Sequence, residues 1–343
     1  MPRRVPVVLI AGRLGAGKST VVNHLLRQAD GVRIGVVVND FGAIGIDAML
    51  VAGQASAVSS LADGCLCCTT DAGGLAALLA ELTAPRTRID LVVVEASGLA
   101  EPRELVRLLL DAIAGEARHA AYGGLVVVVS AVEGAVEGAV EGALDGEHDG
   151  SVRLADLVIL NQVDRVDDPA PLLASLRSRA PGPVLPVVRG ALDPALLVDP
   201  PARRGPPRSG QLSFDVLLRE DAHDEHVHPA GESVAVERDV PLDPARFAAF
   251  LEAGPTGVFR SKGVVRFPGA APFVVQTVGT AIRVRPAPRS VDVAGARLVF
   301  LGVGLDEVEL HSALDACAAD PAAGEPSLLP VLRYEESDRL DAV

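Results

Sequence analysis

The sequence predicts an α/β fold in which a doubly wound, mostly parallel sheet is followed by a smaller α+β domain. Two observations support this prediction. The first part of the chain alternates apolar runs, dominated by Val and Ile, with helical segments, as expected for a parallel sheet covered on both faces. After residue 210 the pattern changes to short alternating strands interrupted by two helices, which is typical of a mostly antiparallel sheet.

The elements of the first domain follow from their apolar runs. Strands are expected at residues 5–11, 32–39, 89–96, 124–131, 155–162 and 183–188. Helices are expected between them, for example at residues 19–28, 74–82 and 102–113. This βαβ rhythm predicts a doubly wound sheet with right-handed crossovers.

A Pro- and Gly-rich stretch at residues 199–210 (DPPARRGPPRSG, from residue 199) indicates a linker. We therefore expect a first domain over 1–198, a second over 211–335 and a tail over 336–343. In the second domain, strands are expected at 213–218, 232–238, 263–268, 273–279, 281–286 and 296–302. Two helices are expected there, at Pro244–Glu252 and Glu307–Ala318.

Composition excludes several classes of protein. With 49% apolar residues the chain can bury a sizeable core, but its net charge of −14 argues against a nucleic-acid surface. No stretch is apolar for long enough to span a membrane. The apolar run at the N-terminus leads directly into a glycine-rich loop, so it predicts a first strand and not a cleaved leader. We expect a cytoplasmic protein.

The glycine-rich loop carries a phosphate-binding motif. Residues 12–19, GRLGAGKS, fit GxxxxGK[ST] and stand between an expected strand and an expected helix. Glycines let backbone N–H groups turn inward around phosphates, and the helix N-terminus adds a positive dipole end. A chance Gly-rich turn is the alternative, which the agreement of motif and context disfavours. The sequence thus predicts a P-loop NTPase whose nucleotide contacts are Gly12, Gly15, Ala16, Gly17, Lys18, Ser19 and Thr20.

Three of the expected site residues have catalytic roles. Lys18 would reach the β- and γ-phosphates, and Ser19 would ligate Mg²⁺. Glu95, at the end of an expected strand, would hold a Mg²⁺-bound water or polarise the attacking one. Gly98 would let its backbone N–H approach the γ-phosphate. The alternative is that Glu95 is an ordinary exposed strand-end acid.

Residues 161–164, Asn-Gln-Val-Asp, predict the base that is bound. GTPases use Asn-Lys-x-Asp at this place, where the Asp carboxylate accepts hydrogen bonds from the guanine N1–H and 2-amino group. Asn161 and Asp164 are present, but Gln162 replaces the lysine whose stem packs on the base. GTP is therefore the expected nucleotide, and a P-loop ATPase or kinase is the alternative.

Three of the four cysteines, Cys65, Cys67 and Cys68, form a CxCC run, and the fourth is far away at Cys317. Three thiolates this close can bind one soft or borderline ion, so we expect a metal site for Zn²⁺ first and Co²⁺ next. Buried small hydrophobes and a redox pair are the alternatives. Cys317 lies in an apolar helical pattern and is expected in the core.

Further metal-ligand candidates lie elsewhere in the chain. Asp40 follows the second strand, in the region that acts as a switch in P-loop GTPases, and is either a metal ligand or a turn carboxylate. His223, His226 and His228 are expected in a solvated loop, with metal binding as the alternative. The imperfect repeat at residues 134–150 is likewise expected to be a solvated loop, with a metal-recruiting acidic patch that includes His148 as the alternative. In a helix, Glu133, Glu137 and Glu141 would lie on one face.

Together these residues resemble the CobW-type family of P-loop GTPases and metallochaperones. The match includes GRLGAGKST, NDFGAIGID, GCLCCT, EASGLAEP, NQVD and GVFRSKGVVRF, in that order. The resemblance implies that the CxCC cysteines bind the transferred metal and that the second domain is the family's C-terminal domain. Its RxKG element matches residues 260–263, which accounts for Lys262, the only lysine besides Lys18. Asp40, Gln162 and Glu101 depart from the family's usual Glu, Lys and Asp.

The predicted function is that of a slow GTPase that binds a divalent metal at the CxCC site and delivers it. The recipient would be a client metalloenzyme or a cobalamin-synthesis protein, and the carrier a monomer or homodimer. GTP and Mg²⁺ would order the segment around Asp40, and hydrolysis would release the metal. The alternative from a different class is a metal buffer or sensor whose nucleotide site gates affinity with little turnover.

Overall fold

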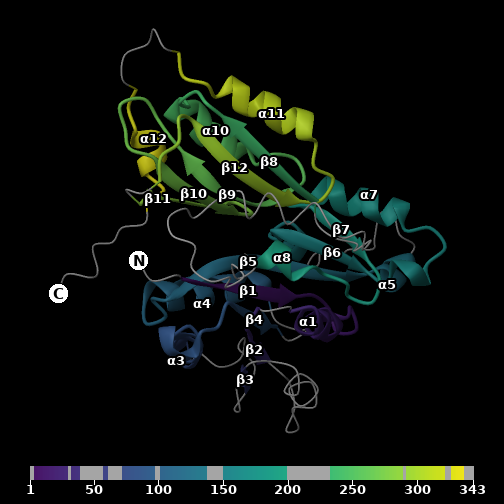
Figure 1. Cartoon of the computed structure of the whole chain (residues 1–343). Helices are drawn as coiled ribbons and strands as arrows, with labels where there is room; N and C mark the ends of the chain where they lie inside the picture. The colour runs from purple at the N-terminus through teal and green to yellow at the C-terminus, as the bar shows by residue number, and fades with distance from the viewer. Residues whose placement is uncertain are drawn as a thin grey trace.

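The structure, a computed structural model, describes residues 4–29, 32–38, 57–60, 72–96, 101–136, 150–198, 232–288, 291–320 and 326–335. Within these residues the chain forms one seven-stranded sheet and one five-stranded sheet (Figure 1). The first sheet falls inside the expected domain 1–198 and the second inside 211–335. Because residues 199–231 and 336–343 lie outside the described residues, the domain limits, the linker and the tail stay predictions.

The seven-stranded sheet is a doubly wound parallel sheet, as expected. Its strand order is β3-β2-β4-β1-β5-β6-β7, and every neighbouring pair is parallel. The strands are β1 (Val5–Ala11), β2 (Ile34–Val38), β3 (Ala57–Ser60), β4 (Leu91–Glu95), β5 (Ala120–Ser130), β6 (Leu157–Asn161) and β7 (Val184–Val187). The edge strand β3 was not expected, since its AVSS run is too short and too polar to resemble the Val- and Ile-rich interior strands.

Helices cover both faces of this sheet because successive strand residues point to opposite sides. In β1, Val7 and Leu9 join a core beneath α3 (Ala72–Leu82), α4 (Pro102–Ala114), α5 (Ala131–Val136) and α7 (Ala170–Arg179). Val8 and Ile10 join the opposite core, beneath α1 (Lys18–Arg27) and α8 (Pro194–Leu197). The central strands are therefore buried on both sides, which explains their continuous apolar runs.

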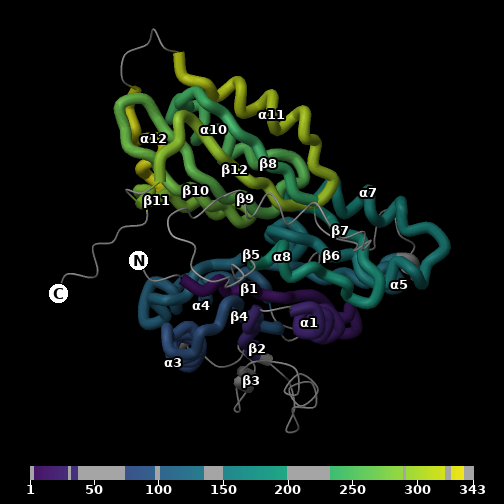
Figure 2. The backbone as a smooth tube through the Cα atoms, in the orientation of Figure 1, coloured from purple at the N-terminus to yellow at the C-terminus, as the bar shows by residue number. Residues whose placement is uncertain are grey.

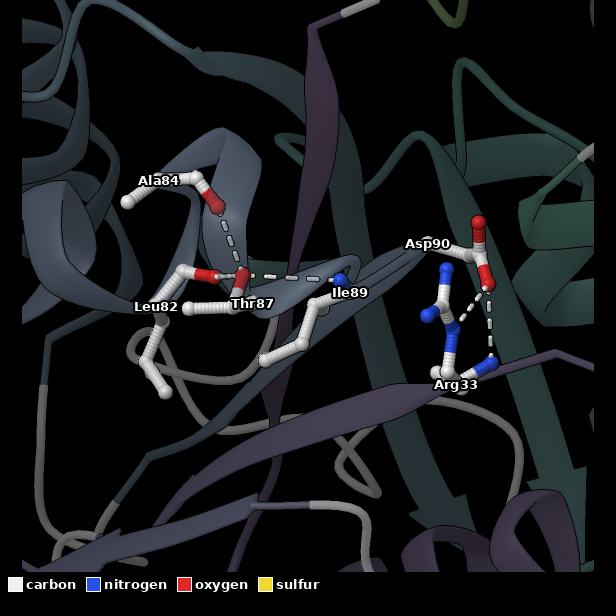
Figure 3. A network of polar contacts seen from close by, with 6 residues as sticks. All are labelled: Arg33, Leu82, Ala84, Thr87, Ile89 and Asp90. Carbon is white, nitrogen blue, oxygen red and sulfur yellow. Dashed lines mark hydrogen bonds and ion pairs between the residues drawn. The ribbon is translucent and has the colours of Figure 1, made fainter.

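A polar network fixes the starts of β2 and β4, near the short helix η1 (Pro85–Thr87) (Figure 3). Asp90 Oδ2 accepts from the backbone N–H of Arg33 at 3.1 Å and from its Nε at 3.3 Å. The Thr87 hydroxyl lies 2.7 Å from the carbonyl oxygen of Leu82 and 2.8 Å from that of Ala84. These contacts hold the chain at the start of β4. The opposite end of β4 carries Glu95, a candidate site residue.

The five-stranded sheet is antiparallel throughout, with the order β11-β10-β9-β12-β8. Its strands are β8 (Glu232–Arg238), β9 (Val258–Val265), β10 (Phe273–Val278), β11 (Ala281–Pro286) and β12 (Ala296–Gly302). The helices are α10 (Pro244–Ala253), α11 (Glu307–Ala316) and the short α12 (Leu329–Leu332). Figure 1 shows α10 and α11 on the face turned away from the seven-stranded sheet.

Most expected boundaries in this second unit are confirmed within two residues, but β9 is displaced. It was expected at 263–268 and instead spans Val258–Val265, because its polar RSKG residues pair with β10 and β12 on either side. Cys317 is buried in the core of this unit, as expected. Burial raises the pKa of its thiol to about 11.

The two sheets meet where β9 and β10 approach β5 and α8, as the backbone trace in Figure 2 shows. Phe259 of β9 packs into the core on the α1 and α8 side of the first sheet. Arg283 of β11 donates to the carbonyl oxygen of Tyr122 in β5 at 3.2 Å. The two units therefore share a continuous apolar and polar junction.

A buried carboxylate lies at the centre of this junction. Asp156, just before β6, accepts from the Tyr122 hydroxyl at 2.5 Å and from the backbone N–H of Leu125 at 2.8 Å. It also accepts from the backbone N–H of Thr280, in the turn between β10 and β11. Burial raises the pKa of the Asp156 carboxyl above 3.8, although these hydrogen bonds act in the opposite direction. Burial, then the Asp156 charge, raises the pKa of Tyr122 above 10.0.

No helix in the described part of the chain is long and apolar enough to span a membrane.

Candidate nucleotide site

The loop between β1 and α1 has a backbone that only glycine can adopt easily at three positions. Gly12, Gly15 and Gly17 have φ angles of 142°, 88° and 96°, in the region that disfavours side chains. A Cβ on Gly12 would lie 2.2 Å from the carbonyl oxygen of Val128. One on Gly17 would lie 2.3 Å from Asn161 Nδ2. The motif thus forms a tight loop that delivers the chain directly into α1 at Lys18, as a phosphate cradle requires.

Lys18 folds back over this loop. Its Nζ donates to the carbonyl oxygens of Gly12 at 3.0 Å and Arg13 at 2.9 Å, and the residue is only 7% exposed. The ammonium is thereby held beside the turn of the loop, where its donors can transfer to phosphate oxygens. This position fits the predicted role of Lys18.

Ser19 and Glu95 meet below the loop. The Ser19 hydroxyl donates to Glu95 Oε1 at 2.6 Å, and Glu95 is 5% exposed. Register places Glu95 of β4 beside Ile10 of β1, and Ala96 N–H donates to the Ile10 carbonyl oxygen. Glu95 is therefore not an exposed strand-end acid. A hydroxyl and a carboxylate oxygen form the hard-oxygen donor set that Mg²⁺ prefers, so these two residues fit the ion.

Asn161, at the end of β6, fastens the phosphate loop to a second turn. Its Nδ2 donates to the Ala16 carbonyl oxygen at 3.0 Å, and its Oδ1 accepts from the Gly190 N–H at 2.9 Å. The side chain is almost fully buried, at 1% exposure. Its described contacts are thus with the protein's own loops, and direct contact with a base stays a prediction.

Gly190 was missed by the sequence reasoning. It follows β7 with φ of 70°, and a Cβ there would lie 2.8 Å from the backbone nitrogen of Val21 in α1. The Arg-Gly pair just after an apolar strand is a turn signal that pointed to it. Its close approach to α1 and its hydrogen bond to Asn161 place this turn beside the start of α1.

Gln162 and Asp164 occupy the turn that follows β6. Gln162 has φ of 65° and precedes the short helix η2 (Val163–Arg165). Its Oε1 accepts from the hydroxyl of Ser130, at the end of β5, at 2.8 Å. Asp164 lies exposed in η2, near the end of β6. Ser130 was also missed, because a lone serine after a Val run carries no signal in the sequence.

Glu133 lies nearer to the site than expected. A Cβ built on Gly15 would be 3.2 Å from Glu133 Oε1, so the carboxylate stands beside the phosphate loop. Glu133 is half-buried in α5. The expected loop at 134–150 is wrong at its first residues, because residues 134–136 continue α5 as a helix.

Several predicted residues lie outside the described residues. They are Asp40, Cys65, Cys67, Cys68, Gly98, Glu137, Glu141, His223, His226 and His228. Among the residues that the structure does describe, no group of three or more His, Cys, Asp or Glu side chains is arranged to hold a metal ion. Thr20 lies exposed in the first turn of α1. The structure thus brings Asn161 to the phosphate loop, while contact with the base and the metal site stay predictions from the sequence.

Comparisons with known proteins agree in both parts of the chain. Residues 6–181 match the family model of the CobW/HypB/UreG nucleotide-binding domain, and residues 232–318 match that of the cobalamin synthesis protein cobW C-terminal domain. A curated protein of Sinorhizobium sp., "Zinc chaperone CobW", is 29% identical over 347 residues, covering 91% of this chain and 97% of that protein. "Zinc-regulated GTPase metalloprotein activator 1" of Dictyostelium discoideum is 31% identical over 146 residues, covering 38% and 30%. Among solved structures, the Zn(II)-bound YjiA GTPase from E. coli aligns with a TM-score of 0.42 and 20% identity, covering 92% of this chain and 100% of that one.

Proposed function

Because the chain belongs to the family defined by the CobW/HypB/UreG nucleotide-binding domain, we propose that it is a GTP-hydrolysing carrier of a divalent transition metal. The observation that carries the nucleotide half of this proposal is the partly buried Ser19–Glu95 hydrogen bond beside a loop held by Lys18. Two relatives named as a zinc chaperone and a zinc-regulated GTPase support the two activities.

In the proposed reaction these residues act by position and charge. Lys18 would donate to the β- and γ-phosphates in place of its carbonyl acceptors, and Ser19 and Glu95 would hold Mg²⁺. Mg²⁺ supplies neutralisation of the charge that develops on the phosphates. Little covalent chemistry is needed from the protein. Slow turnover without a partner is expected because the sequence offers no obvious arginine finger.

The metal half of the proposal assigns Zn²⁺, with Co²⁺ next, to Cys65, Cys67 and Cys68. Three thiolates leave a fourth position for a ligand from a recipient protein. This open coordination suits transfer to a client metalloenzyme or a cobalamin-synthesis protein. Asp40 and Gly98 stay candidate ligands of the metal and the γ-phosphate, respectively.

Steady-state GTP hydrolysis tests the nucleotide assignment. Lys18→Ala and Ser19→Ala should each lower kcat/KM for Mg²⁺–GTP by roughly 100-fold, since each removes a group that stabilises the transferring phosphoryl. Arg27→Ala, which removes an exposed side chain from the same helix, is the matched control and should hydrolyse GTP at the wild-type rate. A Lys18→Ala protein with wild-type turnover would contradict the assignment.

The base preference is tested by the same assay with both nucleotides. Wild-type protein should prefer GTP to ATP, and Asp164→Ala should remove roughly tenfold or more of that preference, because the exposed carboxylate is the group expected to read the guanine N1–H and 2-amino group. Preference for ATP in the wild type would instead support a P-loop ATPase or kinase.

A further inference from the structure

The Ser130 hydroxyl, at the carboxyl end of β5, makes a hydrogen bond to Gln162, the residue that follows β6. Ser130 and Asn161 are register partners at the last position of the two strands. The Ser130 Oγ accepts from the backbone N–H of Glu133 at 3.3 Å and lies 2.8 Å from Gln162 Oε1. Ser130 is 3% exposed, so these protein groups and not bulk water determine its hydrogen bonding.

The direction of this hydrogen-bond chain can be derived. The hydroxyl hydrogen of a buried serine needs an acceptor, and Gln162 Oε1 is the acceptor within reach. Glu133 N–H therefore donates to Ser130, and Ser130 donates to Gln162. This order agrees with the orientation of the Gln162 amide, whose Oε1 faces Ser130. The two Nε2–H groups of Gln162 then remain available to donate to a bound ligand.

The backbone conformation of Gln162 also limits where its side chain can lie. Its φ of 65° and ψ of 30° lie in the left-handed region, which a non-glycine residue adopts only when its surroundings hold it there. Its neighbour Asn161 is tied to the phosphate loop. The backbone of Gln162 is thus constrained at the start of the turn that carries Asp164, and its side-chain amide is held by Ser130.

We propose that Ser130 is a positioning residue for the nucleoside end of the bound nucleotide, which it orients through the Gln162 amide. The Nε2 group then donates to an oxygen of the nucleoside, from the position that a lysine occupies in Asn-Lys-x-Asp GTPases. The inference rests on the proposed guanine-nucleotide binding. It adds Ser130 as a residue that, through Gln162, raises the affinity for the nucleoside part of the nucleotide.

Calorimetric titration with two probes tests it. Mg²⁺–GDP contains the nucleoside, and Mg²⁺–pyrophosphate occupies only the phosphate loop. Ser130→Ala and Gln162→Met should each weaken Mg²⁺–GDP binding roughly three- to tenfold, as expected for one net hydrogen bond, and leave the Mg²⁺–pyrophosphate affinity unchanged. Ser130→Thr keeps the hydroxyl and should retain wild-type affinity. Ser178→Ala, which removes an exposed hydroxyl from α7, is the matched control.

The double variant shows whether Ser130 acts through Gln162. If it does, Ser130→Ala combined with Gln162→Met should bind Mg²⁺–GDP no more weakly than Gln162→Met alone. Multiplied losses, unchanged Mg²⁺–GDP affinity in Ser130→Ala, or an equal loss for pyrophosphate would each overturn the inference while leaving the proposed function intact. Failure of the wild-type protein to bind Mg²⁺–GDP at all would overturn the proposed function itself.

Discussion

Gly17 is the residue on which the shape of the phosphate loop depends most directly. It combines a left-handed φ of 96° with a position at which a Cβ would lie 2.3 Å from Asn161 Nδ2. The amide of Asn161 cannot retreat easily, because its two ends hold Ala16 and Gly190. The phosphate loop, the turn at Gly190 and the start of α1 are therefore linked through the close approach of Gly17 to Asn161.

A methyl group at this position should disrupt the site. Gly17→Ala is expected to destabilise the protein by about 1–3 kcal/mol, from backbone strain together with the displaced buried amide, and to abolish detectable Mg²⁺–GDP binding. Chemical denaturation and calorimetric titration measure the two effects. Gly254→Ala is the control, because Gly254 has φ of 66° but nothing within 4 Å of the added Cβ; it should show strain alone, with unchanged nucleotide affinity.

At the same scale, the sequence predicted residues whose role depends on local pattern. Lys18 and Ser19 follow from an eight-residue motif, and their positions in the structure fit it. A turn signal marks Gly190, but the roles of Ser130 and Gly190 in the site could not be predicted, because each acts through a residue at least 29 positions away. Such contacts depend on which strand ends become neighbours, and single residues do not encode that.

Among the elements, β5 and β6 connect the nucleotide site with the second unit. Their carboxyl ends carry Ser130, Asn161 and Gln162. Near their amino ends, Tyr122 and Asp156 contact the second unit. The apolar runs predicted both strands, since Val and Ile buried on two faces leave a continuous signal. The expected strand at 155–162 includes Asp156, but it did not predict the contact of Asp156 with the turn between β10 and β11, because that contact depends on how the second unit docks.

Asp156 makes stability depend on pH in a defined direction. Burial raises the pKa of its carboxyl in the folded protein above the ordinary 3.8, so the folded state holds the proton more tightly than the unfolded state. The contribution of Asp156 to the free energy of unfolding is fully present below pH 3.8 and is lost as pH rises through its raised pKa. Urea denaturation between pH 3.5 and 8 should therefore show this fall in wild-type protein and a smaller fall in Asp156→Asn. Parallel pH profiles for the two proteins would contradict the prediction.

For the whole molecule, the junction fixes how the two sheets sit together. The turn between β10 and β11 approaches Asp156 so closely that a Cβ on Gly279 would lie 1.7 Å from its Oδ1. Phe259 supplies the apolar part of the contact. The order of elements predicted two units, but their docking depends on a buried polar cluster that no local pattern reveals.

Gly279→Ala should loosen this docking without unfolding either unit. We expect its thermal unfolding to separate into two transitions, with the second unit melting first by roughly 5 °C or more, as for a loss of about 1 kcal/mol or more from a domain of that size. Gly304→Ala provides the comparison, because Gly304 has φ of 65° and open space around it. A single transition at the wild-type temperature in Gly279→Ala would show that the contact does not hold the units together.

The central claim is that nucleotide and metal binding belong to one carrier. The measurement that tests it most directly is the Zn²⁺ affinity of the full chain, with Co²⁺ as competitor, in the presence of Mg²⁺–GDP and of Mg²⁺ with a non-hydrolysable GTP analogue. The account predicts affinities that differ by roughly tenfold between the two nucleotides, with no such difference in Lys18→Ala and no tight Zn²⁺ binding in Cys67→Ser. Equal Zn²⁺ affinity in both nucleotide states of the wild-type protein would contradict it.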